Sequence, residues 1–154
     1  MTISRREFLA RGTAVGLGLT ILPRLARAVL LPSIAVYKSP TCGCCGAWVD
    51  HMKANGFEVA VHDMDDLTPI KSRYGVGSRL QSCHTALVGG YVIEGHVPAS
   101  DVKQLLQDRP KIVGLTIPGM PMSAPGMDGK PFQPYDVLSF DAAGKTTLYK
   151  RHTS

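Results

Sequence analysis

The chain has 154 residues, of which 44% are hydrophobic, and its 17 basic residues outnumber its 12 acidic residues by five. The first 28 residues hold five arginines and one glutamate, so 12 basic and 11 acidic residues remain after them and residues 29–154 have a net charge of +1. This near neutrality argues against a nucleic-acid-binding protein, and the length and hydrophobicity suit one domain with its own core.

The first 28 residues have the pattern of an export signal. Arg5 and Arg6 form a twin-arginine pair, Thr13–Leu22 is apolar or neutral, and Ala26-Arg27-Ala28 offers a small-x-small cleavage site. The apolar run is well short of the roughly 20 residues that a membrane-spanning helix needs. We therefore expect residues 1–28 to be a twin-arginine signal peptide, and residues 29–154 to form a periplasmic domain that is not bound to the membrane after cleavage.

The mature domain begins with a predicted strand, helix and strand. Ser33–Lys38 is short, apolar and β-branched, as is typical of a strand. In Cys45–Asn55 the apolar residues recur at helical spacing, and Gly56 stands where a C-cap glycine belongs. Phe57–Asp63 alternates with a period of two, which predicts a half-buried strand.

A second helix and a hairpin are predicted next. Thr68 can cap a short helix that ends near Gly75. The apolar runs Ala86–Val88 and Tyr91–Ile93 flank Gly89-Gly90, which is a hairpin signal.

A third helix, which Ser100 can cap, extends to Asp108. This element order is that of a thioredoxin-like α/β fold, with a mixed four-stranded sheet and flanking helices. Residues 117–134 read as a proline- and glycine-rich loop, and residues 135–140 and 146–151 as a hairpin. The predicted fold therefore has a C-terminal extension made of this loop and the β-hairpin.

Three of the four cysteines, Cys42, Cys44 and Cys45, lie where the first strand meets the first helix. The partial positive charge of a helix N-terminus lowers the pKa of a thiol, which favours both redox attack and metal ligation. Two structural disulfides are the ordinary expectation for an exported chain with four cysteines. A Cys42–Cys45 bond would leave Cys44 and Cys83, however, and a bond between the adjacent Cys44 and Cys45 would be strained. A reactive cluster is therefore favoured over structural disulfides.

A copper site would use every sulfur. Thiolates are soft ligands that select Cu(I), and a thiolate can bridge two Cu(I) ions, so one copper per cysteine would give an electrically neutral cluster. Zinc and iron–sulfur sites fit less well, because three cysteines on one tight turn suit a tetrahedral site poorly. The predicted metal ligands are Cys42, Cys44, Cys45 and Cys83. In the alternative, a thiol–disulfide oxidoreductase, the catalytic residues are Cys42 as the attacking thiolate and Cys45 as the resolving one.

Cys83 lies just before the third predicted strand, in a loop that faces the CxxC motif in the thioredoxin-like fold. Thioredoxins and glutaredoxins usually carry a cis-proline beside that strand, whereas this chain has Cys83, His84 and Thr85. The departure argues against an ordinary disulfide reductase and places the fourth sulfur opposite the other three. His84 is either an additional ligand through a ring nitrogen or an exposed loop residue.

Three segments together resemble the periplasmic copper-resistance CopG family: YKSPTCGCCGAW (residues 37–48), SCHTALV (82–88) and GLTIPGMPMSAPGM (114–127). The resemblance covers nearly all of residues 34–151. It implies a thioredoxin-like domain that binds multinuclear Cu(I) through the four cysteines, in copper resistance or copper redox handling. The expected partners are copper ions and periplasmic copper carriers or efflux components.

The C-terminal loop carries Met120, Met122 and Met127, which fit this function as thioether donors on a lid or a transfer arm; the alternative is core packing. Trp48 is expected to pack beside the site. The four remaining histidines have no ligand spacing and are expected in surface or core positions: His51, His62, His96 and His152.

Overall fold

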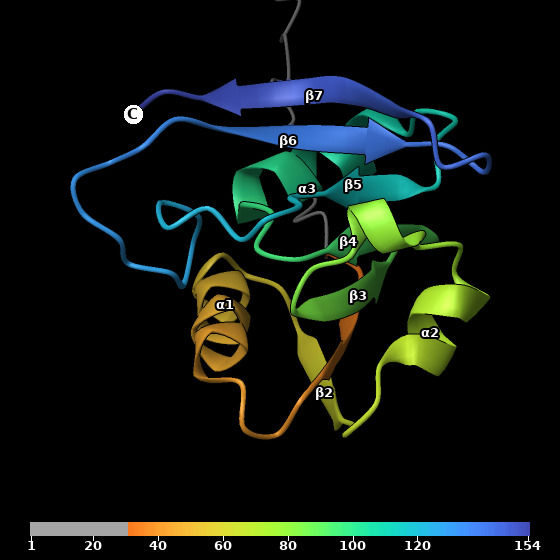
Figure 1. The fold of residues 1–154 in the computed structure, drawn as a ribbon, viewed down its shortest axis with the longest axis horizontal. Coiled ribbons are helices and arrows are strands. Elements are labelled where there is room, and N and C mark those ends of the chain that lie inside the picture. The colour runs from red at the N-terminus through yellow and green to blue at the C-terminus, as the bar shows by residue number, and fades with distance from the viewer. Residues whose placement is uncertain (1–30) are drawn as a thin grey trace, which may run out of the picture.

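The computed structural model describes residues 31–154, so the predicted export signal lies outside the described residues. Within them the chain forms one seven-stranded sheet, three α-helices and one short 3₁₀ helix (Figure 1). In chain order the elements are β1 (Ile34–Lys38), α1 (Gly43–Ala54), β2 (Val59–Asp63), α2 (Thr68–Arg73), η1 (Ser78–Leu80), β3 (His84–Val88), β4 (Tyr91–Glu94), α3 (Ala99–Asp108), β5 (Gly114–Thr116), β6 (Tyr135–Phe140) and β7 (Thr146–His152).

The sheet is mixed, with strand order β2-β1-β3-β4-β5-β6-β7. The β1–β2 and β4–β5 pairs are parallel and the other four pairs are antiparallel. The predicted α/β class and both predicted hairpins are confirmed. The sheet is larger than the four strands predicted, because the short strand β5 pairs with β4 on one side and β6 on the other. The C-terminal hairpin β6–β7 therefore continues the same sheet, as Figure 1 shows.

The glycine predicted to end the first helix does so, since Gly56 follows the C-cap Asn55 with a φ of +88°. The two predicted serine and threonine caps are wrong. Thr68 is itself the first residue of α2, and its backbone N–H donates to Oδ1 of Asp66 at 2.8 Å. Helix α3 begins at Ala99 after Pro98, and the Ser100 hydroxyl donates to Asp101 inside the helix.

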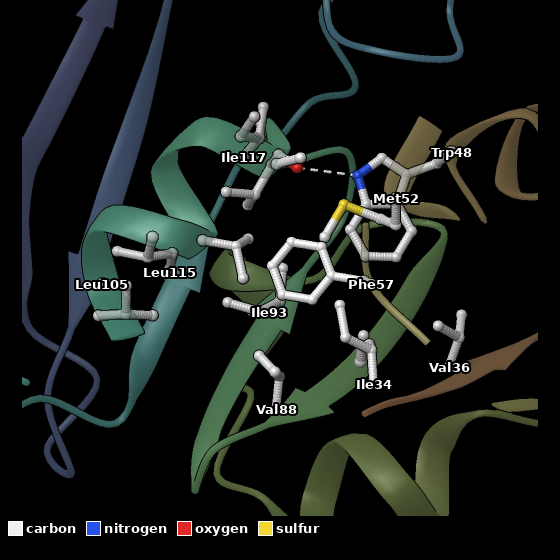
Figure 2. Packing of buried hydrophobic residues seen from close by; sticks show 14 of the residues in the cluster. Ile34, Val36, Trp48, Met52, Phe57, Val88, Ile93, Leu105, Leu115 and Ile117 are labelled. Atoms are coloured by element: carbon white, nitrogen blue, oxygen red, sulfur yellow. Dashed lines mark hydrogen bonds between the residues drawn. The ribbon is translucent and has the colours of Figure 1, made fainter. Parts of the chain in front are cut away.

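Helices α1 and α3 pack on one face of the sheet and form the main hydrophobic core (Figure 2). Trp48 and Met52 of α1 are fully buried, and the Trp48 indole N–H donates to the backbone oxygen of Val97 at 2.9 Å. Burial of each such side chain stabilises the fold by roughly 1.5–3 kcal/mol. The prediction that Trp48 packs beside the cysteines is confirmed.

A smaller core lies on the opposite face of the sheet, because Val92 and Ile93 are adjacent on β4 and point to opposite faces. It contains Val76, Leu80, Val92 and Phe140. None of the helices in residues 31–154 is long and apolar enough to cross a membrane.

Candidate metal centre

Strand register brings four connecting segments to one end of the sheet. The last residue of β1, Lys38, pairs with His84 at the start of β3, and Thr85 pairs with Glu94 at the end of β4. Strand β5 is parallel to β4 and ends at the same level, where Thr116 pairs with Glu94. Four segments therefore lie side by side at this end of the sheet: the cysteine loop after β1, the turn before β3, the turn after β4 and the methionine loop after β5.

The four cysteines meet at this end of the sheet. Cys42 is the N-cap of α1, so Cys44 and Cys45 lie in the first turn of the helix. Cys42 and Cys45 form a disulfide, whereas Cys44 and Cys83 are free thiols. The four Sγ atoms all lie within 4.8 Å of one another, and those of Cys42 and Cys44 are 3.5 Å apart. The predicted ligand set is thus brought together in space.

The four cysteines have an oxidised state, in which Cys42 and Cys45 form the disulfide, and a reduced state with four thiols. While the Cys42–Cys45 bond is present, these sulfurs are not thiolates, and two of the four thiols remain. Reduction restores four thiols around one point, three of them at the positive end of α1, where thiolates are stabilised. The oxidised pair is the one that the redox alternative requires.

Two buried histidines extend the cysteine cluster. Nε2 of His96 lies 3.1 Å from Cys83 Sγ, and Nδ1 of His84 lies 3.5 Å from the same sulfur. Together with Cys45 they form a second group of donors within 4.8 Å of one another. His84 is fully buried at the start of β3, and not exposed on a loop.

His96 is buried, which was one of its two expected positions, but it also lies beside the cysteine cluster, which its spacing in the sequence did not indicate. It follows β4, and the register of β3 and β4, which spacing along the chain does not reveal, places it beside Cys83. Its Nδ1 lies 2.7 Å from the backbone oxygen of Pro125, so Nδ1 donates and Nε2 keeps a lone pair toward the sulfur.

Burial sets the protonation of these donors. It lowers the pKa of His84 well below the usual value, with smaller contributions from His96, Lys71 and Lys38, and it also lowers the pKa of His96. Both imidazoles are therefore neutral near pH 7, the form that binds metals. Burial, aided by the nearby Cys44, raises the pKa of Cys83 to about 11, so a metal must displace the proton of this thiol.

The donor chemistry fits a soft, thiophilic cation. Both groups contain sulfur, the second adds nitrogen, and neither includes a carboxylate. Thiolate and imidazole select copper or zinc over hard cations such as Mg²⁺ and Ca²⁺. The ring nitrogen of His84 near the cluster is Nδ1, whereas its Nε2 is buried and has no hydrogen-bond partner among residues 31–154.

The three methionines of the C-terminal loop lie in different environments. Met120 is 43% exposed and, with Cys83, lines a hollow of about 340 Å³. Met122 is 52% exposed, whereas Met127 packs against the main core. Met120 therefore lines an opening next to one of the four sulfurs, and Met127 has the packing role that was the alternative expectation.

One end of the methionine loop is held against the cysteine helix. Pro125 accepts the hydrogen bond from His96, and the next residue, Gly126, has a φ of +82°. A Cβ atom at Gly126 would lie 2.8 Å from the backbone nitrogen of Trp48 and 3.0 Å from the backbone oxygen of Cys44. Glycine is thus required for the loop to approach α1 this closely.

Two solved structures, described as copper resistance protein CopG in forms 1 and 2, are similar to this chain. Each is 38% identical to it and matches with a TM-score of 0.75, over 80% of this chain and 99% of the other. A family model described as "Protein of unknown function, DUF411" matches residues 80–127, which include Cys83 and His96. No curated protein matches the chain.

Proposed function

Because this chain belongs to the CopG copper-resistance family, we propose that it is an exported protein that binds copper as Cu(I), in a multinuclear cluster bridged by cysteine sulfurs. The observation that carries the proposal is the convergence of all four Sγ atoms within 4.8 Å, from the first turn of α1 and the turn before β3. Copper is the cargo of this site, held for copper resistance or for redox handling of the metal.

Charge balance favours several copper ions over one. A single Cu(I) among four thiolates would leave a large negative charge in a site where Cys45 is fully buried and the other cysteines are half-buried. One Cu(I) per bridging thiolate makes the cluster neutral, and this assigns a function to Cys44 that a simple dithiol does not need. Soft sulfur ligands also bind Cu(I) more tightly than they bind harder metal ions.

His84 and His96 supply nitrogen donors on the Cys83 side of the cluster. Met120 lines the hollow beside Cys83, and we propose that its thioether transfers Cu(I) to that sulfur. Met122 and Met127 act as accessory donors only if the loop moves, because one is at the surface and the other packs on the core.

A thioredoxin-like fold for the elements from β1 to α3 is supported by strand pairing. The order β2-β1-β3-β4, with β1 and β2 parallel and β3 antiparallel to β1, puts the CxxC motif at the N-terminus of α1. This arrangement, with the Cys42–Cys45 disulfide, also favours a second candidate function, a periplasmic thiol–disulfide oxidoreductase in which Cys42 and Cys45 are catalytic.

We also propose that the protein acts in the periplasm after twin-arginine export, as one 29–154 domain. The charged pair, the apolar run and the cleavage triplet in residues 1–28 support this route. Its partners there would be copper ions and the periplasmic carriers or efflux components that deliver or remove them.

The deciding experiment compares the four single cysteine-to-serine variants under anaerobic, reducing conditions. Copper equivalents per protein and the rate of disulfide reduction are measured for each variant. The cluster predicts that Cys44→Ser and Cys83→Ser lose copper nearly as severely as Cys42→Ser and Cys45→Ser. If Cys44→Ser and Cys83→Ser bind copper like the wild type, while Cys42→Ser abolishes a robust reductase activity, the oxidoreductase replaces the cluster.

A further inference from the structure

A buried ion pair lies directly behind the turn that carries Cys83. Lys71 of α2 and Glu94 at the end of β4 are in contact, and their side chains are 7% and 0% exposed. Neither residue belongs to the two groups of metal donors. The pair therefore lies next to the proposed copper site but contributes no donor atom to it.

The carboxylate of Glu94 holds the turn on both sides of Cys83 and His84. Its Oε1 accepts the backbone N–H of Ser82 at 2.6 Å, and its Oε2 accepts the hydroxyl of Thr85 at 2.7 Å. One rigid side chain thus fixes the residue before and the residue after the two donors.

Lys71 completes the same network from the helix side. Its Nζ donates to the backbone oxygen of Ser82 at 3.0 Å, to Oγ1 of Thr85 at 3.1 Å, and to Glu94. These three bonds use all three N–H groups of the ammonium. Both backbone polar atoms of Ser82 and the hydroxyl of Thr85 are consequently bound by one ion pair.

A buried ion pair is a poor source of net stability, because its desolvation cost offsets most of the attraction between the charges. Apolar side chains of the same volume would often stabilise a core at least as well. What the ion pair adds here is directional: four hydrogen bonds fix the positions of Ser82 and Thr85, in addition to the contact between the two charged groups.

We propose that Lys71 and Glu94 are positioning residues for copper binding, which hold the Ser82–Thr85 segment so that Cys83 meets the helix cysteines and His96. The inference rests on the proposed function, because it takes Cys83 as a copper ligand. A preformed position for this sulfur removes the ordering cost that a loose turn would add to metal binding. The network thereby raises copper affinity without contacting the metal.

Thr85→Val is the mildest test, because it removes the hydroxyl shared by Lys71 and Glu94 but preserves side-chain shape and net charge. Thr85→Ser restores the hydroxyl, and Glu94→Gln removes the buried negative charge with little change in shape. The matched control is Asp101→Asn. Asp101 is also fully buried and paired, with Lys150 and His152, but it lies on α3.

Cu(I) affinity is measured anaerobically by competition with a colorimetric Cu(I) chelator, at a temperature where circular dichroism shows every variant to be folded. Loss of an outer partner of a metal ligand typically weakens binding by about 10- to 100-fold, and we expect at least the lower figure for Thr85→Val and Glu94→Gln. Thr85→Ser should recover most of this loss. Asp101→Asn should lower the unfolding temperature and leave copper affinity unchanged.

A second readout needs no copper. In the metal-free protein with its disulfide formed, Cys44 and Cys83 are the thiols open to alkylation by iodoacetamide, and peptide mass spectrometry reports each separately. A loosened turn should speed the alkylation of Cys83 in Thr85→Val and leave the rate at Cys44 unchanged.

Two different results would overturn the inference. If Cys83→Ser loses copper while Thr85→Val and Glu94→Gln keep wild-type affinity and wild-type alkylation of Cys83, the ion pair has only a structural role and the cluster stands. If Cys83→Ser itself binds copper like the wild type, the proposed ligand set fails, and the positioning role fails with it.

Discussion

His96 Nε2 lies 3.1 Å from Cys83 Sγ, although 13 positions separate the two residues in the chain. The other ring nitrogen of His96 donates to Pro125 in the methionine loop. One imidazole thus joins the fourth sulfur of the cysteine cluster to the C-terminal extension. This arrangement makes His96 a proposed donor for copper and a connection between the cysteine cluster and the methionine loop.

Replacement of His96 by alanine is expected to weaken Cu(I) binding by about tenfold or more, because it removes a neutral nitrogen beside Cys83 and frees the Pro125 carbonyl. The affinity is measured by chelator competition under anaerobic conditions. His62→Ala is the control, since His62 is exposed on the edge strand β2 and stacks on Tyr37. Equal affinities for His96→Ala and the wild type would exclude His96 from the site.

Copper capacity should depend on the redox state of the protein. The Cys42–Cys45 disulfide removes two of the four thiols, so the oxidised protein should bind fewer copper equivalents than the reduced protein, and a reductant should restore the difference. Metal analysis after gel filtration measures both states. Cys45→Ser, which cannot form this bond, should show no such response. Identical copper content in the oxidised and reduced wild type would count against thiolate ligation by Cys42 and Cys45.

Export should require the twin-arginine pair. Changing Arg5 and Arg6 to lysine keeps the charge of the segment but removes the pair, so the protein should no longer reach the periplasm. Cell fractionation detects the loss, and mass spectrometry of exported wild-type protein should give an N-terminus near Val29. Arg11→Lys is the control and should be exported normally. Efficient export of the double variant, or mature protein that retains Met1, would show the signal assignment to be wrong.

The metal-free protein should become less stable in mild acid. Nε2 of His51 accepts the backbone N–H of Ala99 at 3.1 Å, and burial, with a smaller effect of Lys103, lowers its pKa. The unfolded chain therefore takes up a proton at His51 before the folded protein does, so the free energy of unfolding falls as pH drops below about 6.5. It stops falling at the lower pKa of the folded state.

Burial lowers the pKa of His84 and His96 in the same direction, so the acid effect is shared among three histidines. His51→Gln should make the pH dependence shallower without abolishing it. Denaturant unfolding between about pH 7.5 and about pH 5.5 measures the slope. A His51→Gln variant with the slope of the wild type would show that His51 does not contribute.

Gly126→Ala should destabilise the protein more than Gly144→Ala. Both glycines have a positive φ, +82° and +74°, so alanine carries a backbone cost of roughly 1–2 kcal/mol at either position. Only at Gly126 would the added Cβ also crowd the backbone of Cys44 and Trp48, whereas Gly144 has open space. Unfolding midpoints compare the two variants. Equal losses would mean that the loop does not pack tightly against α1.

Local patterns in the sequence were sufficient to predict most of the elements and three members of the site. The run of Cys42, Cys44 and Cys45 after an apolar strand predicts thiols at a helix N-terminus, and the Gly89-Gly90 pair predicts the hairpin that it forms. These features depend on residues a few positions apart, where backbone preferences act directly. The cap residues were less predictable, because the carboxylate of Asp66 accepts the first N–H of α2 and α3 begins after Pro98 without a side-chain cap.

The remaining parts of the site depend on strand register, which only the tertiary structure decides. His96 faces Cys83, and Glu94 holds Ser82 and Thr85, because β3 and β4 pair with Thr85 opposite Glu94. Strand β5 has three residues and exists because it fits between β4 and β6. A shift of one residue in the β3–β4 pairing would turn these side chains to the other face of the sheet. Register is set by packing and hydrogen bonds between segments distant along the chain, so no spacing within the sequence reveals it.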